Sequence, residues 1–320
     1  MKKIRFGVFS TAKIGMKKVI PAMQKGTLTE VSAISSRSIE RAKNAARKLE
    51  IPKTYGSYEE LLADPEIDAI YNPLPNHLHV PWSIQALEAG KHVLCEKPIS
   101  LTSSEAQKLL DASEKNPDLK VMEAFMYRHH PRWQKTKEWV DEGRIGELNT
   151  VHSYFSYYND NPDDIRNQAE IGGGGMMDIG CYCISAARFL FGGEPQQAES
   201  VLKMDSEFQT DKVASALLDF GSGTSVFTCS TQSSPHQYVQ IFGTKGHILL
   251  NTPFTPAPDE QTEIHLYKNG SSETFSIEPH DQYTVQGDLF ARSILEDTPV
   301  PTPLQDAVDN MKVIEQLLRQ

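Results

Sequence analysis

The sequence predicts an α/β protein with a doubly wound parallel sheet, followed by an α+β domain with a large, open and mainly antiparallel sheet. Strand-like and helix-like stretches alternate through the first 125 residues, and this alternation is typical of a parallel sheet with crossover helices. The rhythm then changes, and residues 196–280 consist of strand-like runs joined by glycine-containing turns. The 320 residues are sufficient for two domains.

The first domain can be followed one element at a time. The strand-like IRFGVFS precedes the helical GMKKVIPAMQK, and EVSAISS precedes SIERAKNAARKLE. The same order recurs where DAIYNPLP is followed by HVPWSIQALEAG and HVLCEKP by SSEAQKLLDASEK, before KVMEAFMY ends the series. Since the links between these stretches are short, we expect residues 1–125 to form one domain.

The remaining residues predict a different architecture. PRWQKTKEWVDEG predicts a helix, and the alternating LNTVHSYFSYYN predicts a strand with one buried face. A second helix, MMDIGCYCISAARFLF, follows the glycines at residues 172–175. Glycines in DFGSGTSV, FGTKGHI and YKNGSSETF favour hairpin turns, and TPVPTP separates two closing helices at 283–296 and 303–319. We expect residues 126–320 to form the second domain.

Composition excludes several classes of protein. The net charge is −10, and no basic stripe is present that could neutralise the phosphates of a nucleic acid. No apolar stretch reaches the length of a membrane span, and the N-terminus lacks the apolar core of a signal peptide. The spacing of Cys95, Cys181, Cys183 and Cys229 matches neither a zinc site nor a disulfide framework. We therefore expect a cytoplasmic protein without a metal, a nucleic acid or a membrane as partner.

The turn between the first strand and the first helix has the position of a dinucleotide-binding loop. Laid on G-x-G-x-x-G, the segment GVFSTAKIG places Ser10, Ala12 and Gly15 at the three glycine positions, so two glycines are missing. Serine and alanine are small enough to let the backbone approach a pyrophosphate, and the following helix offers free N–H groups. A plain strand–helix connection stays open as the alternative. We expect the cofactor to contact Ser10, Thr11, Ala12, Lys13 and Ile14.

The end of the second strand predicts which dinucleotide is bound. Proteins that bind NAD usually place an acidic residue there to hold the ribose hydroxyls. This chain has Ser35-Ser36-Arg37-Ser38 instead. The Arg37 guanidinium and the Ser36 hydroxyl suit a 2′-phosphate, and no carboxylate repels it. We expect NADP as the cofactor in preference to NAD; the alternative is that Arg37 only decorates the start of a helix.

The segment EAGKHVLCEKPIS places a lysine where a buried strand ends. Pro98 cannot donate a hydrogen bond to a sheet ladder, so the strand stops before it. Lys97 therefore lies at the carboxyl end of a predicted parallel strand, where open α/β sheets bind their ligands. The alternative is an ordinary surface lysine. The order of the motifs along the chain favours the functional interpretation.

Several stretches together resemble the Gfo/Idh/MocA family of sugar-type oxidoreductases, and the resemblance runs nearly end to end. They are YNPLPNHLHVPWSIQALEAGKHVLCEKPIS, EAFMYRHHP and IRNQAEIGGGGMMDIGCY, in this order after the first βα turn. The resemblance implies an N-terminal Rossmann domain and a C-terminal α+β domain. It also implies that Lys97, the lysine of the E-K-P motif, lies beside the nicotinamide and the substrate.

One departure from the family pattern is informative. Many members carry D-x-G-x-x-x-H on the helix of the second domain, whereas this chain continues from Asp178 to Tyr182 without a histidine. In this respect it is similar to the subgroup with dimeric dihydrodiol dehydrogenase and D-xylose 1-dehydrogenase, where a tyrosine takes the position. Asp178 and Tyr182 are four residues apart and share a helix face. A nearby Lys97 ammonium and the oxidised nicotinamide would lower the pKa of Tyr182 from about 10 and make it a base.

The remaining site residues are expected with structural alternatives beside them. Asn76, His79 and Glu96 resemble cofactor-facing positions, although each is equally explained as a cap, a core-edge polar group or a support for the lysine strand. Asp178, Arg166 and Arg128 resemble substrate-facing positions, although an isolated arginine in a loop often has a structural role. Aromatic residues that could stack on a sugar are more simply explained by sheet packing: Phe125, Tyr154, Phe155, Tyr157 and Tyr158.

The leading hypothesis is an NADP-dependent dehydrogenase with Lys97 and Tyr182 as an acid/base pair. Its expected substrate is an aldose in the pyranose form, a cyclic polyol or a vicinal diol. A non-catalytic NADP-binding regulator and an NAD-assisted glycosidase are the alternatives; a regulator would need neither Lys97 nor Tyr182, and Arg37 suits an NAD enzyme poorly. The resemblance also implies a homodimer or higher homo-oligomer that packs through the open sheet.

Overall fold

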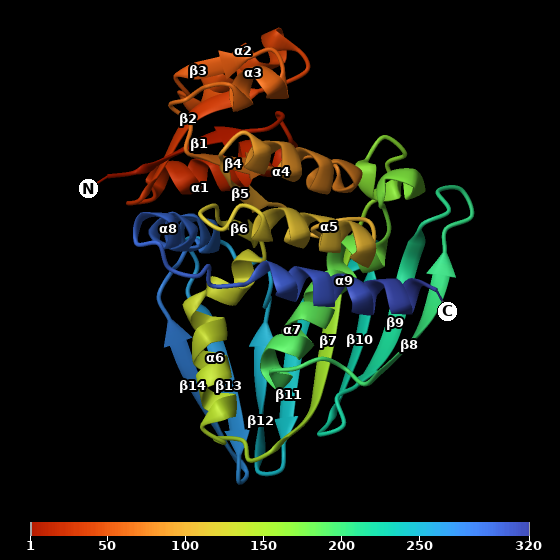
Figure 1. Ribbon diagram of the computed structural model, residues 1–320. Coiled ribbons are helices and arrows are strands. Elements are labelled where there is room, and N and C mark those ends of the chain that lie inside the picture. Colours follow the sequence, from red (N-terminus) through yellow and green to blue (C-terminus); the bar gives the residue numbers. More distant parts are fainter. Residues whose placement is uncertain (1, 320) are drawn as a thin grey trace. The chain divides into compact units, whose positions relative to one another are not determined.

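The computed structural model describes residues 2–319 and divides into two units (Figure 1). The first unit consists of Met1–Met126 and Asp281–Val308, and the second consists of Tyr127–His280 and Asp309–Gln320. No helix among the described residues combines the length and the apolar character that a membrane crossing requires.

The first unit contains a six-stranded parallel sheet in the order β3-β2-β1-β4-β5-β6. Its strands are β1 (Ile4–Val8), β2 (Thr29–Ser35), β3 (Lys53–Tyr55), β4 (Ala69–Asn72), β5 (His92–Cys95) and β6 (Val121–Glu123). Its helices in the N-terminal segment are η1 (Gly15–Val19), α1 (Ile20–Lys25), α2 (Ile39–Leu49), α3 (Tyr58–Leu62), η2 (Asn76–Leu78), α4 (His79–Glu88) and α5 (Ser103–Glu114). The predicted parallel α/β sheet is confirmed.

Helix starts in this unit are specified locally by the sequence. Ser57 accepts a hydrogen bond from the Glu60 amide, while the Glu60 carboxylate accepts one from the Gly56 amide. Thr102 and Glu105 repeat this reciprocal arrangement at the start of α5. These contacts resemble capping boxes, which satisfy amides that a helix start leaves without partners, so α3 and α5 begin at a defined residue.

The strand order brings the predicted cofactor loops to one edge of the sheet. β1 pairs with β2 on one side and with β4 on the other, and β4 pairs with β5. Because all these strands are parallel, the loops that follow them leave from the same edge. The chain reverses its direction of sheet growth between β1 and β4, and ligands of open α/β sheets bind at such a switch point.

The helix α8 (Gln282–Leu295) changes the expected domain organisation. The sequence placed residues 126–320 in the second domain, whereas the structure packs Asp281–Val308 in the first unit. Phe290 of α8 is fully buried with its ring centroid 6.2 Å from that of Phe6. The Asp288 carboxylate accepts hydrogen bonds of 2.9 Å from the amides of Thr27 and Leu28. The sequence of an amphipathic helix does not show which sheet it covers. The packing of α8 in the first unit was therefore not predictable.

The second unit contains an eight-stranded sheet in the order β14-β13-β12-β11-β7-β10-β9-β8. The neighbours are antiparallel, except for the parallel pair β7 and β10. The strands are β7 (Leu148–Tyr158), β8 (Gln197–Met204), β9 (Asp211–Asp219), β10 (Thr224–Ser230), β11 (Gln232–Gly243), β12 (Gly246–Asn251), β13 (Thr262–Lys268) and β14 (Ser271–Ile277). The expected mainly antiparallel sheet is confirmed.

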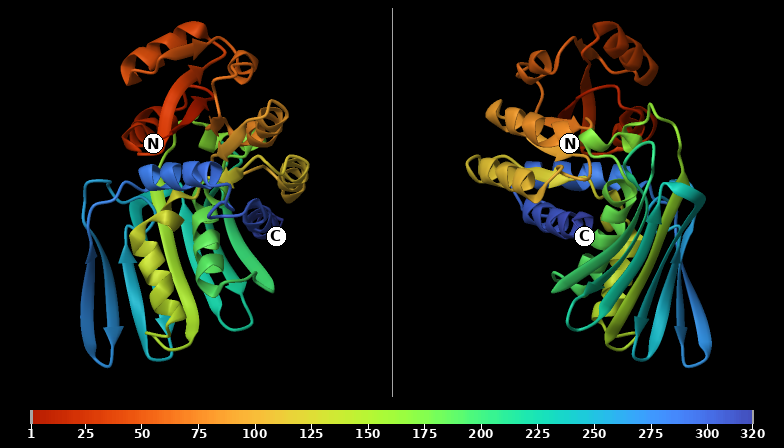
Figure 2. Two further views of the ribbon diagram at one scale, coloured as in Figure 1. Left: turned by 60° about the vertical axis from the view of Figure 1, so that its left-hand side comes forward. Right: turned by 90° about the vertical axis from the view of Figure 1, so that its right-hand side faces the viewer.

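Helices cover one face of this sheet and leave the other bare (Figure 2). The helices of the segment are η3 (Met126–His129), α6 (Pro131–Asp141), η4 (Ile165–Asn167), η5 (Ala169–Ile171), η6 (Met176–Gly180) and α7 (Cys181–Phe191), and the last helix of the chain is α9 (Leu304–Leu318). On β7, Val151 and Phe155 are buried, whereas the alternate residue His152 is exposed. This period of two defines a covered face and an open face.

Candidate active site

Lys97 lies in the turn that follows β5, and three side chains hold the residues around it. The Tyr71 hydroxyl donates a hydrogen bond of 2.7 Å to Glu96 Oε1. The Ile99 amide donates one of 2.7 Å to Glu123 Oε1, and His79 Nδ1 lies 2.8 Å from the carbonyl oxygen of Pro98. The turn is therefore fixed on both sides of the lysine, while Lys97 itself is partly exposed.

Glu96 supports this turn from within the sheet. Its side chain is buried, and its partner Tyr71 is fully enclosed. Burial raises the pKa of the Tyr71 hydroxyl well above its usual value, and the Glu96 charge raises it further. Tyr71 therefore stays protonated and keeps donating to the Glu96 carboxylate. This contact is consistent with the supporting position that the sequence left open for Glu96 beside direct cofactor contact.

His79 requires a correction, because the sequence predicted a cofactor-facing side chain. Its ring is completely buried, with Nε2 2.6 Å from the Leu74 carbonyl oxygen and Nδ1 on the Pro98 carbonyl oxygen. Burial lowers the pKa of His79 to about 4, and a neutral ring donates to only one of these two oxygens. The ring joins the loop after β4 to the lysine turn and leaves no edge for a cofactor. Asn76, at the start of η2, is partly exposed in the same loop.

The loop after β1 lies where a dinucleotide-binding turn is expected, and it contains one left-handed residue that is not glycine. Ser10 adopts a φ of 63°, a left-handed conformation that glycine reaches at lower cost. The Ser10 hydroxyl accepts a hydrogen bond of 3.2 Å from the Ala12 amide, which supports the turn. Thr11, Ala12 and Ile14 are partly exposed and Lys13 is exposed. The loop is small-sided and leads directly into η1, so these residues fit a pyrophosphate.

The loop after β2 carries a cation and no carboxylate. The Ser36 hydroxyl accepts a hydrogen bond from the Ser38 amide, and the Arg37 side chain is exposed. Burial raises the pKa of Tyr58, and the neighbouring Arg37 guanidinium opposes that rise. The first acid in the following helix, Glu40, pairs with Lys43 at 3.1 Å. This loop therefore fits an additional phosphate on the ribose better than free ribose hydroxyls.

In the second unit, Tyr182 lies on α7, which continues from η6. The Cys181 amide bonds back to the Met176 carbonyl, five residues earlier, so the helix opens with a wide π turn of the kind found at functional sites. Tyr182 is only 5% exposed. Its ring centroid lies 5.7 Å from those of Tyr127 and Phe155 and 5.4 Å from that of Phe254. The phenol is thus held in an aromatic pocket.

Asp178, on the same helix, is the centre of a polar cluster. Tyr157 donates a hydrogen bond of 2.5 Å to Asp178 Oδ2, and Arg166 Nε donates one of 3.0 Å to the same oxygen. Arg166 Nη1 also donates to Asp164 at 3.2 Å. Burial and the Asp178 charge raise the pKa of Tyr157, and the Asp178 charge raises that of Arg166. The structure brings together Asp178 and Arg166, two of the residues predicted to face the substrate.

Arg128, the third residue predicted to face the substrate, is held against α7. Its Nε donates to the Ser185 hydroxyl and its Nη2 to the Ser185 carbonyl, both at 3.1 Å. The guanidinium lies 5.3 Å from the centre of the Phe189 ring, and the side chain is buried. These contacts fasten η3 to α7. They pack Arg128 within the second unit, and its expected substrate contact stays a prediction.

Sequence reasoning missed three residues that support the site. Tyr71 and Glu123 both stand in or at the end of buried parallel strands, and a polar residue at that place was the available signal. Tyr157 was set aside as sheet packing, yet its hydroxyl donates to Asp178. Its position on the covered face of β7 follows from the alternation of that strand, so this contact was within reach of the sequence.

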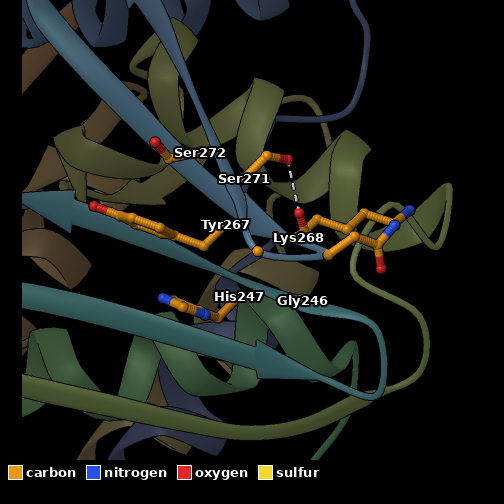
Figure 3. Close-up of a pocket in the computed structure, with 8 residues that line it drawn as sticks. Gly246, His247, Tyr267, Lys268, Ser271 and Ser272 are labelled. Atoms are coloured by element: carbon orange, nitrogen blue, oxygen red, sulfur yellow. Dashed lines mark hydrogen bonds between the residues drawn. The ribbon is translucent and has the colours of Figure 1, made fainter.

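One cavity of the second unit lies apart from the predicted site residues. This cavity of about 530 Å³ is lined by residues 246–247 and 267–272 of the β12, β13 and β14 region (Figure 3), and it includes none of the predicted site residues. His247 and Tyr267 stack there with ring centroids 4.5 Å apart. Between residues 2 and 319, no group of three or more His, Cys, Asp or Glu side chains is arranged to hold a metal ion.

Comparison with known proteins agrees with this description. A family model described as an oxidoreductase family with an NAD-binding Rossmann fold matches residues 4–125, and the GFO/IDH/MocA C-terminal domain matches residues 133–249. The chain is also 37% identical to D-xylose 1-dehydrogenase (NADP(+)) 2 of Haloferax volcanii, over 97% of this chain and 95% of that protein. The chain belongs to the GFO/IDH/MocA family of oxidoreductases.

Other members of the GFO/IDH/MocA family extend the comparison. Trans-1,2-dihydrobenzene-1,2-diol dehydrogenase of Xenopus tropicalis is 30% identical over 86% of this chain and 82% of that protein. KijD10, a 3-ketoreductase from Actinomadura kijaniata solved with NADP and TDP-benzene, superposes with a TM-score of 0.93. It is 32% identical, and the match covers 99% of this chain and 98% of that chain. Variants of KijD10 with one lysine or one tyrosine replaced have also been solved. The expected family and the expected oxidoreductase class are confirmed.

The support of the lysine turn can be tested without a substrate. Tyr71→Phe removes the donor to Glu96 and should weaken the turn by about 1 kcal/mol, the usual value of a buried hydrogen bond. Amide hydrogen exchange of residues 96–100 should then accelerate about fivefold, measured by mass spectrometry of peptic fragments.

The matched control is Tyr55→Phe, which removes a hydrogen bond of 2.6 Å to Asp64 in the same unit. This variant should leave exchange at residues 96–100 unchanged. Equal acceleration in both variants would show that Tyr71 acts only through general stability of the sheet.

Proposed function

We propose that this protein is an NADP-dependent dehydrogenase acting on a hydroxyl-bearing carbon of an aldose in its pyranose form, a cyclic polyol or a vicinal diol. The observation that carries the proposal is the lysine turn after β5, which three side chains hold at the sheet edge where the Ser10 and Arg37 loops also leave. A surface lysine without a function would not need such support.

The relatives support both the cofactor and the substrate class. One is an NADP-dependent D-xylose 1-dehydrogenase, one acts on a dihydrodiol, and KijD10 binds NADP. In this chain the loop after β2 offers Arg37 and lacks an acid that would hold free ribose hydroxyls. NADP is therefore favoured over NAD, and a sugar or diol hydroxyl over other alcohols.

In the proposed mechanism, Lys97 and Tyr182 act on the same substrate hydroxyl. Tyr182 Oη takes the hydroxyl proton during oxidation and returns it during reduction. The Lys97 ammonium favours the tyrosinate form and orients the oxygen, while the aromatic pocket around Tyr182 excludes water. When bound, the nicotinamide cofactor supplies the hydride acceptor. Asp178 and Arg166 are proposed to bind further hydroxyls of the substrate.

Two other functions from different classes make distinct predictions. A non-catalytic NADP-binding regulator would have no use for a supported lysine or for a buried tyrosine in an aromatic pocket. An NAD-assisted glycosidase would hold NAD tightly and would not reduce added cofactor, and the Arg37 loop does not favour NAD. Retention of Lys97, Tyr182 and Arg37 in one chain therefore favours the dehydrogenase.

The acid/base pair is tested by Lys97→Met and Tyr182→Phe. Each variant should lower kcat by about 10²- to 10⁴-fold, because it removes a positioned proton-transfer group or its supporting charge. The dissociation constant of NADPH, measured by fluorescence titration, should stay within about threefold, since neither change removes a phosphate contact.

Two surface variants serve as matched controls. Lys108→Met replaces an exposed lysine of α5, and Tyr158→Phe removes the hydroxyl of a tyrosine that is 61% exposed. Both should keep the kcat of the unchanged protein. Near-normal turnover in Lys97→Met or Tyr182→Phe would contradict the acid/base assignment.

Cofactor choice is tested by Arg37→Ala. Loss of a bidentate guanidinium–phosphate contact should weaken NADPH binding about 30- to 100-fold and leave NADH binding almost unchanged. Arg41→Ala, one turn further along α2 and also exposed, is the matched control and should bind NADPH normally. NADH binding as tight as NADPH binding in the unchanged protein would contradict the assignment to NADP.

We also propose that the open face of the second sheet forms a homodimer. The positions of β10, β7, β11 and β12 that point to this face include Val226, Tyr154, Tyr238 and Leu249. Over the described residues of those strands, the outward positions from Thr224 to Ser230, Thr150 to Ser156, His236 to Phe242 and His247 to Leu249 carry no Asp, Glu, Lys or Arg. Depletion of charge with enrichment of aromatic residues is typical of an interface core.

The dimer is tested by sedimentation velocity of Val226→Asp, a change at a side chain that is 41% exposed. Burying an unpaired carboxylate in an interface is costly, so the variant should sediment as a monomer where the unchanged protein is a dimer. The control is Ile39→Asp on α2, which is 37% exposed and lies in the first unit. An unchanged protein that is monomeric at micromolar concentration would contradict the proposal.

We place the protein in the cytoplasm, where its four buried free cysteines stay reduced.

A further inference from the structure

Two of the glycines that precede the Tyr182 helix, Gly174 and Gly175, lie against one buried acid. We propose that Asp211, the first residue of β9, is a positioning residue that holds the start of the helix carrying Asp178 and Tyr182. This inference rests on the proposed role of Tyr182 in catalysis. Asp211 follows a turn between two strands of the second sheet, and no sequence motif marks it.

The hydrogen-bonding geometry shows how the acid and the helix meet. Asp211 Oδ2 accepts a hydrogen bond of 2.6 Å from the Met176 amide, the first residue of η6. The Asp211 side chain is only 3% exposed. Burial raises the pKa of Asp211 to about 7, while the amides of Met176 and Gly175 act in the opposite direction because they favour the carboxylate. The acid is thus enclosed and directed at the helix start.

The glycines allow this close approach. Gly174 has a φ of 119°, and a Cβ atom there would lie 2.1 Å from Asp211 Oδ1. A Cβ atom on Gly175 would lie 3.1 Å from the Asp211 carbonyl oxygen and 3.2 Å from Oδ2. Any other residue at position 174 would push the carboxylate away from the helix. Gly174, Gly175 and Asp211 therefore form one structural unit.

No local residue replaces this anchor. The residue before η6 is Gly175, which offers no side chain as a cap, although other helices in this chain begin with a serine, threonine or aspartate cap. An N-terminal acid stabilises a helix by accepting from its free amides and by complementing its dipole. Here that acid comes from a neighbouring strand. β9 is paired on both sides, with β8 and β10, so the anchor itself has a rigid base.

The consequence for catalysis concerns position rather than chemistry. Asp178 lies two residues after Met176 and Tyr182 six residues after it, on the same continuous helix. A shift of the helix start by a fraction of a turn would move the phenol relative to the substrate. Since a misplacement of about 1 Å can cost about 10²-fold in rate, Asp211 should affect kcat without touching the substrate.

The experiment compares Asp211→Ala, Asp211→Asn and Asp205→Ala. Asp211→Ala should lower kcat by about tenfold because Tyr182 is displaced, and kcat/KM should fall at least as much because Asp178 lies on the same helix start. The amides of residues 176–182 should exchange faster by about the same factor. Asp211→Asn keeps an acceptor oxygen and should restore kcat to within about threefold of the unchanged protein.

Asp205 is the matched control, since it is a buried acid in the turn just before β9. It accepts hydrogen bonds from the amides of Glu207 and Phe208 and makes none to the helix. Asp205→Ala should lower the unfolding temperature and keep kcat. Unchanged exchange at residues 176–182 in Asp211→Ala, or an equal loss of kcat in Asp205→Ala, would overturn the proposal. The exchange readout needs no substrate, so it decides the role of Asp211 even for a protein that fails every dehydrogenase assay.

Discussion

The parallel order of β1, β2, β4 and β5 is the constraint on which the cofactor side of the site depends. Parallel strands end at one edge, so four loops that are far apart in sequence leave the sheet together. Backbone groups at buried strand ends need partners, and in the lysine turn Glu123 accepts from the Ile99 amide while the His79 ring contacts the Pro98 carbonyl. The Tyr71 hydroxyl adds a hydrogen bond to the Glu96 side chain. The same contacts that complete the sheet therefore also position Lys97.

In the second unit, the start of the helix that carries Tyr182 is held by a residue from another strand. Its helix must begin against a sheet and still present Asp178 and Tyr182 in fixed directions. Glycines remove the side chains that would keep the backbone away, and Asp211 supplies the missing cap from β9. The cost is a carboxyl group buried with few polar neighbours, whose pKa rises to about 7. Stability is given up locally where a precise position is needed.

The sequence was informative where local chemistry determines structure. Alternating βα stretches predicted the first sheet, which is confirmed. Small residues in the Ser10 loop predicted a dinucleotide turn, and in the structure Ser10 adopts a left-handed conformation. The sequence was not informative where a side chain contacts a residue that is distant in the chain. His79 looked like a ligand-facing residue, but one ring nitrogen contacts the carbonyl oxygen of Pro98, which lies 19 residues further along the chain. Likewise, the sequences around α8 and Asp211 do not predict which distant segment each one packs against.

The central claim is that the protein transfers hydride between NADP and a carbon that carries a sugar or diol hydroxyl. Its most direct test is the near-ultraviolet absorbance of NADP⁺ mixed with the protein and a panel of aldoses, inositols and vicinal diols. The account predicts reduction of NADP⁺ with one of these classes, which would also name the substrate group. Absence of reduction across the panel, in a protein that still binds NADPH tightly, would contradict it and favour a regulator or a hydride-borrowing glycosidase.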